Sequence, residues 1–498
     1  MGALAGLATA LSLFATRTGP RATQDSANYL AMAKRLFGDG AMVGVGGRPV
    51  AVFPPGYPGL LALGDAAMGQ ALWLRLLPAM CAAATVVCVG VLVRRHVEDR
   101  RWSVVAAAGA ALSPALSLVW MTTWSEGPFV AALGVFVVAA DALWSDHAPT
   151  SGGGRGRAWL GVAVLAIWAA TSFRYLGVVL VPVLGTVVAL RHRPVRWRGA
   201  GLGLAAAAVA IVVPGAIVAR NLAVDGSPLG ARTPSVASPA DLLSTAASTV
   251  LQWVVPGSAL LALVVLTAAG CWLVLSGRSG IVRSTLVDLG PTGWTAGLMF
   301  AFLLVSGLTT SLDGMDDRLM SALVVPLLVI LAVVADGVAQ EGPQFARAVL
   351  TCAAAWLVLA AAATVAQAID PPVSLAPSRF AGSELMASTR QLPSGATVVS
   401  NRPEAVWMAT GRRPVGPMPT TSPRGWEPAD PVSSGLRHTV GCAGGSVLAV
   451  WFDDVRAPWI APEDLPTEFD VDVVELRDDG RVLRISASGP LPDDCPAA

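Results

Sequence analysis

The sequence predicts a mainly α, polytopic membrane protein with a C-terminal extracytoplasmic α/β domain. Of its 498 residues, 54% are hydrophobic and only 13% are charged, about half the charged share of an average soluble protein. Apolar stretches recur through the first three quarters of the chain, so one signal peptide cannot account for them. After Asp370 the composition becomes polar and rich in β-branched residues. These observations divide the chain into residues 1–369 and 370–498.

The apolar part predicts about eleven membrane helices, because a bilayer core needs about 20 apolar residues and tilted or protein-buried helices deviate from that length. The expected segments are Gly2–Ala15, Ala71–Val93, Trp102–Trp120, Gly127–Trp144, Ala158–Ser172, Leu176–Leu190, Gly201–Val218, Val250–Leu275, Trp294–Ser311, Leu319–Val334 and Ala348–Ala368.

Arginine placement predicts how these helices are oriented. Short cytoplasmic loops carry an excess of Lys and Arg, and four arginine groups fall on alternate loops, at residues 94–101, 155–157, 191–198 and 278–283. We therefore expect a multi-pass protein of the plasma membrane with a cytoplasmic N-terminus and residues 370–498 outside. The opposite, outer loops contain Asp25, Glu126, Arg174, Arg220 and Arg318.

The first outer loop, residues 16–70, is polar and aromatic. Tyr29, Leu30, Ala33 and Leu36 recur at helical spacing, which predicts a helix lying at the membrane interface. The Pro54–Pro58 stretch, Pro-Pro-Gly-Tyr-Pro, then leads into a second short helix before Ala71.

The polar C-terminal part alternates strand and helix signals, which predicts a small α/β domain. We expect strands at Ala396–Val399, Val447–Trp451, Val471–Val474 and Val482–Ile485, and helices at Ser383–Arg390 and Pro403–Met408.

The net charge, the histidines and the cysteines indicate which partners, metal sites and disulfides the chain can have. A net charge of +1 gives no support for a nucleic-acid partner. The histidines and cysteines show no metal-ligand spacing. Cys442 and Cys495 lie in the polar tail, and we predict a disulfide bond between them if that tail faces an oxidising compartment.

In order and spacing, the polar motifs resemble those of the polytopic GT-C glycosyltransferases. Within that superfamily the sequence resembles the bacterial protein O-mannosyltransferase-like and lipid A aminoarabinose transferase-like enzymes. The resemblance rests on Asp25 with Tyr29, Pro54–Pro58, Ser125–Phe129, Phe173–Gly177, Ala219–Asn221, Asp317–Leu319 and the outer C-terminal domain.

The resemblance implies inverting transfer of a sugar from a polyprenyl-phosphate donor to an envelope acceptor, a lipid, polysaccharide or protein, at the outer face among membrane lipids. Asp25 is then expected as the catalytic base or as a metal ligand. The family often has a second acidic residue beside this aspartate, whereas this chain has Ser26. The remaining expected residues are Tyr29, Arg174, Arg220 and Arg318 for the donor and its phosphate; Glu126, Tyr57 and Tyr175 as acceptor-side or accessory residues; and Asp25 with Glu126 for a divalent Mg²⁺ or Mn²⁺.

Several of these residues could instead have simpler structural roles. Asp25 could cap a helix, Tyr29 could anchor the interface, and the arginines could be interfacial anchors. The whole chain could also be a noncatalytic relative that binds a lipid-linked sugar or acts as a scaffold. A transporter or flippase is a further alternative, although such proteins place charges near the midplane of broken helices, and here they lie at helix ends.

Overall fold

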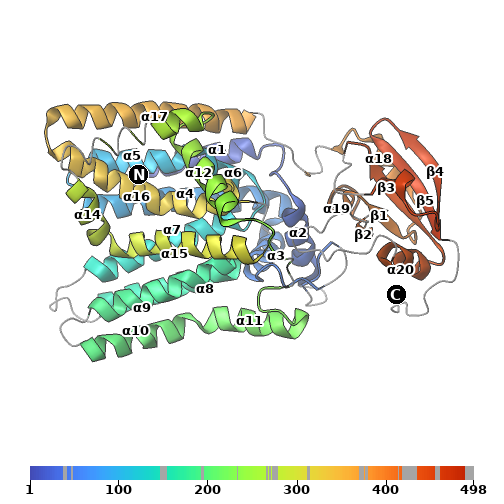
Figure 1. Ribbon diagram of the computed structural model, residues 1–498, viewed down its shortest axis with the longest axis horizontal. Helices are drawn as coiled ribbons and strands as arrows, with labels where there is room; N and C mark the ends of the chain where they lie inside the picture. The colour runs from blue at the N-terminus through green and yellow to red at the C-terminus, as the bar shows by residue number, and fades with distance from the viewer. Residues whose placement is uncertain are drawn as a thin grey trace.

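The structure is a computed structural model with a helical bundle at one end and a small sheet domain at the other (Figure 1). It describes residues 1–36, 42–45, 49–145, 154–191, 196–230, 232, 234–264, 267, 271, 279–310, 314–369, 375, 380–412, 414–417, 434–454 and 460–487. The predicted fold class, a multi-pass helical protein with a C-terminal α/β domain, is confirmed.

The bundle contains apolar helices of very different burial. In the described part of the chain, six helices are long and apolar enough to cross a membrane, or up to eight if each of two bent pairs forms one span. In α7, 72% of the most apolar stretch is buried, against 11% in α17, so α7 is central and α17 peripheral. The helices are α1 (Gly2–Ala15), α4 (Gln70–His96), α5 (Arg100–Ala111), α6 (Pro114–Met121), α7 (Glu126–Ser145), α8 (Gly154–Phe173), η1 (Tyr175–Val179), α9 (Leu180–Arg191), α10 (Arg196–Ala210), α11 (Val212–Asp225), α12 (Pro239–Val254), α14 (Ser279–Asp288), α15 (Gly290–Thr309), α16 (Asp317–Gln340) and α17 (Pro343–Ile369).

Three expected segments differ from the helices that form. Trp102–Trp120 is broken into α5 and α6 with a 47° bend, because Ser113 caps α6 and Pro114 occupies its first turn. The Gly201–Val218 segment is likewise bent by 44° between α10 and α11. The third of these segments, Val250–Leu275, was expected to begin at Val250. That residue instead lies inside the amphipathic α12, which ends at Val254. The predicted number of eleven spans stays a prediction.

The first outer loop forms the two expected short helices, α2 (Gln24–Leu36) and α3 (Gly56–Met68). They lie at the end of the bundle that faces the sheet domain (Figure 1). Gly56 permits a close approach to α8, because a Cβ there would lie 2.5 Å from the Cβ of Ser172 and 2.7 Å from its carbonyl oxygen. The Pro-Pro-Gly-Tyr-Pro stretch therefore fixes α3 against the bundle.

The C-terminal sheet domain is built on a five-stranded sheet of order β2-β1-β3-β5-β4. β1 pairs in parallel with β2 and β3, whereas β5 pairs antiparallel with β3 and β4. The sequence did not predict β2, whose prolines are tolerated here because it is an edge strand. The elements are α18 (Glu384–Gln391), β1 (Val398–Ser400), α19 (Pro403–Thr410), β2 (Pro414–Pro417), α20 (Ser434–Cys442), β3 (Ser446–Phe452), η3 (Pro462–Asp464), β4 (Phe469–Arg477) and β5 (Gly480–Ala487).

The two domains meet where α19 packs against α2. The Lys34 ammonium lies 5.1 Å from the centroid of the Trp407 ring, and Leu375 N–H donates a hydrogen bond of 2.8 Å to the carbonyl of Ala22. At the opposite end of the bundle, α9 ends and α10 begins (Figure 1). Arg191 of α9 and Arg198 of α10 thus lie at the far end from the sheet domain. The orientation in the membrane stays a prediction.

Candidate active site

The centre of the candidate site is a buried carboxylate held by two arginines. Glu126 begins α7 and is 1% exposed. Its carboxylate forms ion pairs with Arg174 and, through Nε at 2.5 Å, with Arg318. The positive end of the α7 dipole also favours a carboxylate at this first position. Glu126 is therefore the fixed anion around which the arginines are arranged.

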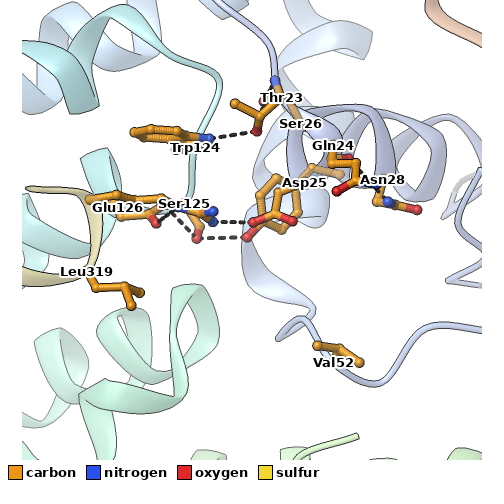
Figure 2. A network of polar contacts seen from close by, with 12 residues as sticks. Thr23, Gln24, Asp25, Ser26, Asn28, Val52, Trp124, Ser125, Glu126 and Leu319 are labelled. Atoms are coloured by element: carbon orange, nitrogen blue, oxygen red, sulfur yellow. Dashed lines mark hydrogen bonds and ion pairs between the residues drawn. The ribbon is translucent and has the colours of Figure 1, made fainter. Parts of the chain in front are cut away.

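Asp25 joins this cluster from the other side. It lies in the first turn of α2, and its carboxylate forms an ion pair with the terminal nitrogen of Arg318. Figure 2 shows the side chains of Asp25 and Glu126 pointing toward one another from α2 and α7. Arg318 bridges the two carboxylates, and its guanidinium carbon lies 4.8 Å from the centroid of the Trp124 ring. Residues separated by 293 positions in the chain thus come into direct contact.

Tyr29, one turn after Asp25, faces the same cluster. Its hydroxyl lies 3.1 Å from the Ser125 hydroxyl, which in turn donates to Glu126 over 3.3 Å. The ring packs against Phe53 at 4.8 Å and edge-on against Tyr57 at 4.9 Å. Burial, reinforced by the charges of Asp25 and Glu126, raises the pKa of Tyr29 above its ordinary range. The phenol therefore stays neutral and acts as a hydrogen-bonding group.

Tyr57 lies behind Tyr29 and is 3% exposed. Burial, followed by the proximity of Tyr29, raises the pKa of Tyr57 well above its ordinary range. The structure thus places this expected acceptor-side residue as a packing partner of Tyr29.

Ser26, at the position where the resemblance implies a second acid, has a structural role. It is fully buried, donates a 2.9 Å hydrogen bond to the Thr123 carbonyl and accepts one of 2.9 Å from Thr23 N–H. Nearby, the Trp124 indole donates to the Thr23 hydroxyl over 2.8 Å (Figure 2). These bonds fix α2 to the segment before α7, and a carboxylate at position 26 would face a carbonyl oxygen. The second carboxylate near Asp25 is instead Glu126.

Tyr175, Arg220 and Asn221 form a second group of contacts, against residues 50–51 of the first outer loop. The Tyr175 hydroxyl donates to the Ala51 carbonyl over 2.6 Å and accepts from the Asn221 amide over 2.7 Å. Arg220 donates 3.0 Å hydrogen bonds to the Asn221 side-chain oxygen and to the Val50 carbonyl. None of the contacts described for Arg220 is to a carboxylate.

Arg232 is a further candidate that the sequence reasoning missed. It donates a 3.2 Å hydrogen bond to the Val52 carbonyl, and no described residue gives it a carboxylate partner. Burial lowers the pKa of Arg232, as does the charge of Arg174, whereas the nearby Asp25 and Tyr29 raise it. It therefore lies within electrostatic range of the cluster. One arginine in a polar loop has no local sequence signal beyond its position on the outer side.

The carboxylates do not fit a divalent metal in this arrangement. Asp25 and Glu126 are both paired with Arg318, which stands where a shared ion would have to bind. Among the described residues, no group of three or more His, Cys, Asp or Glu side chains could hold a metal.

The predicted disulfide lies partly outside the described residues. Cys442 is disulfide-bonded, and Cys495 lies outside the described part of the chain. Cys81, Cys88, Cys271 and Cys352 are free. The pairing of Cys442 with Cys495 stays a prediction.

The sequence matches no protein-family model and no curated protein, but the structure resembles solved structures. ArnT from Cupriavidus metallidurans is 14% identical in its apo state, covers 97% of each chain and has a TM-score of 0.63. The ArnT structure bound to undecaprenyl phosphate is 13% identical, covers 98% of each chain and has a TM-score of 0.60. The chain has the GT-C fold.

A more distant GT-C structure agrees with this result. The Archaeoglobus fulgidus oligosaccharyltransferase, in complex with Zn and sulfate, is 13% identical, with a TM-score of 0.56 over 90% of this chain and 67% of that chain. At such identities the likeness establishes the fold. The GT-C fold of this chain brings Asp25, Tyr29, Glu126, Arg174 and Arg318 together, and places Tyr175, Arg220 and Arg232 against the first outer loop.

Proposed function

We propose that the protein is an inverting glycosyltransferase that moves a sugar from a polyprenyl-phosphate donor to an envelope acceptor at the outer face of the plasma membrane. The observation that carries this proposal is the convergence of Asp25, Glu126, Arg174 and Arg318, from four distant segments, at one end of a GT-C bundle. In support, the similar ArnT has a crystal structure bound to undecaprenyl phosphate, and the archaeal oligosaccharyltransferase has a structure in complex with an inhibitory peptide and a dolichol phosphate.

Asp25 is the proposed base. Its carboxylate takes the proton of the acceptor hydroxyl while the hydroxyl oxygen forms a bond to the anomeric carbon of the sugar. On the opposite face of that carbon the bond to the phosphate oxygen breaks, and the phosphate leaves with the electron pair. The ion pair with Arg318 orients the carboxylate, and side-chain orientation of this kind contributes to catalysis.

The arginines divide into two roles. Arg174 and Arg318 are already paired with carboxylates, so their charge is largely compensated. Arg220 and Arg232 donate only to carbonyl and amide oxygens among the described contacts. A lipid phosphate needs uncompensated cations, and guanidinium forks match its oxygens. We therefore assign the donor phosphate chiefly to Arg220 and Arg232, with Arg174 and Arg318 positioning Glu126 and Asp25.

The test uses purified protein in nanodiscs, a radiolabelled polyprenyl-phosphate sugar and an envelope extract as acceptor. Asp25→Asn should lower turnover at least about 100-fold, in line with the loss of a general base, without loss of donor binding. Asp65→Asn is the matched control, because Asp65 is an exposed acid of the same outer loop. Unchanged turnover in Asp25→Asn would remove Asp25 from the mechanism. Donor binding without turnover in the wild-type protein would favour a noncatalytic relative.

A metal requirement is measured in the same assay. Turnover of the EDTA-treated protein is compared before and after adding Mn²⁺ or Mg²⁺. Recovery with the ion would mean that Arg318 leaves its position between Asp25 and Glu126 when the ion binds.

A further inference from the structure

A cavity lies at the junction of the two domains, outside the cluster described above. Its volume is about 370 Å³, within the range of small-molecule sites. The residues around it come from the first outer loop, the start of α4, the segment before α7, and α19. The lining residues Thr18, Lys34 and Gly411 are exposed, so the cavity is open to solvent.

The lining combines an aromatic ring, a cation and neutral polar groups. Trp407 contributes its indole, and Lys34, the only lysine of the chain, holds its ammonium 5.1 Å from that ring. Thr18, Thr123 and Gln70 add hydroxyl and amide groups. None of the described lining residues carries a carboxylate, and no described contact pairs Lys34 with one. Trp407 is 8% exposed, so only the part of the indole that lines the cavity offers an apolar surface to the C–H groups of a sugar ring. The Lys34 ammonium contacts the indole but no described carboxylate, and it attracts an anionic substituent.

The cavity and the candidate active site contact different faces of α2. Leu30 and Lys34 line the cavity, whereas Asp25 and Tyr29 of the same helix contact Arg318 and Ser125. Both pairs are spaced by four residues, so each forms a row on its own face of the helix. Thr123, which lines the cavity, also accepts the hydrogen bond from Ser26 through its carbonyl. A ligand in the cavity would therefore contact the helix that carries the proposed base.

We propose that this cavity binds an anionic saccharide, a sugar ring bearing a phosphate or a carboxylate, as a subsite for the acceptor. The ring packs on Trp407, the anionic substituent binds Lys34, and Thr18, Thr123 and Gln70 hydrogen-bond the hydroxyls. The assignment to the acceptor rests on the proposed function, whereas the saccharide site itself does not.

Binding is tested by saturation-transfer NMR on the full-length protein in phosphatidylcholine nanodiscs. The probes are glucose 1-phosphate and glucuronate, with glucose as the neutral control. Saturation of the ring protons is expected for at least one anionic probe, at several times the signal of glucose, and the stronger probe identifies the substituent. Lys34→Met and Thr18→Phe, both exposed positions, should lower that signal at least 5-fold. Thr245→Phe, an exposed position on α12, should leave it unchanged.

The transfer assay gives a second, separate readout. Lys34→Met and Thr18→Phe should raise the KM for the envelope acceptor about 10-fold, which corresponds to 1.4 kcal/mol, with donor KM and kcat unchanged. Equal NMR signals in wild type and variants, or no signal from either anionic probe, would overturn the saccharide site. An absence of any sugar transfer by the wild-type protein would overturn the proposed function, and the NMR result would still decide the cavity.

Discussion

Glu126 is the residue on which the candidate site depends most directly. It is buried and is the shared partner of Arg174 and Arg318. Glu126→Gln leaves two guanidinium groups without this anion, and removing one partner of a buried pair costs about 3–5 kcal/mol. We expect a clear fall in the melting temperature and a loss of turnover of at least about 10-fold. Glu384→Gln is the control, because Glu384 is 63% exposed and lies 3.8 Å from Arg477; such a pair contributes less than about 1 kcal/mol. Equal melting temperatures for both variants would refute the role of Glu126.

Arg232 gives a second test at this scale. Replacing it with glutamine keeps a donor for the Val52 carbonyl but removes the charge assigned to the donor phosphate. Arg232→Gln should weaken binding of undecaprenyl phosphate about 10-fold, or 1.4 kcal/mol, with little change in melting temperature. Arg390→Gln is the matched control, since Arg390 also donates to a backbone carbonyl but lies exposed in the C-terminal sheet domain. An unchanged affinity in Arg232→Gln would mean that residues other than Arg232 bind the donor phosphate. The measurement is titration of the lipid into protein in nanodiscs.

The sequence motifs predicted which residues form the site, but they did not predict which of these residues contact one another. Arginine sidedness put Asp25, Glu126, Arg174 and Arg318 on one side of the membrane, and the structure brings these residues together. The pairing itself was not predictable, because each ion pair joins segments whose relative position depends on packing of the whole bundle. From the sequence, Ser26 is notable only because an acid is expected at that position. Its structural role depends on the hydrogen bond that it donates to the Thr123 carbonyl, which the sequence does not reveal.

At the scale of elements, the loop between α11 and α12 is held against the first outer loop by Gly230. Its φ is +81°, and a Cβ would lie 2.5 Å from the backbone nitrogen of Val52. Gly226 has a φ of +66° but nothing within 4 Å of a Cβ. Gly226→Ala therefore costs only the left-handed strain, about 1–2 kcal/mol, whereas Gly230→Ala also separates the two loops. We expect Gly230→Ala alone to weaken undecaprenyl phosphate binding, measured by titration, because Arg232 moves with the loop. Equal effects of the two variants would contradict this arrangement.

Element boundaries show where apolar patterns are informative. The first outer loop forms α2 and α3 as its spacing predicts, because helical periodicity and the prolines act locally. The break between α5 and α6 was missed although Ser113 and Pro114 signal a new helix start, since hydropathy alone does not separate one span from two bent halves. The edge strand β2 was missed because its two prolines argue against a strand in the absence of the sheet.

At the scale of the whole molecule, the position of the sheet domain bears on the sidedness of the protein. It packs on α2 through α19, beside the loops that form the candidate site. A disulfide in that domain requires an oxidising compartment, and Cys442 is disulfide-bonded whereas the four cysteines in apolar segments are free. A disulfide there is what the orientation predicted by the arginine pattern requires, and that orientation stays a prediction.

We predict that the partner of Cys442 is Cys495, so that peptide mapping of the unreduced protein yields one linked peptide containing both. Closing a loop of about 50 residues stabilises the folded domain by about 4 kcal/mol in the chain-entropy model. Cys442→Ser should therefore lower the melting temperature of the outer domain. Cys352→Ser, at an exposed free thiol in α17, should not. Alkylation of both Cys442 and Cys495 without reductant would reject the bond and, with it, this line of support for an extracytoplasmic domain.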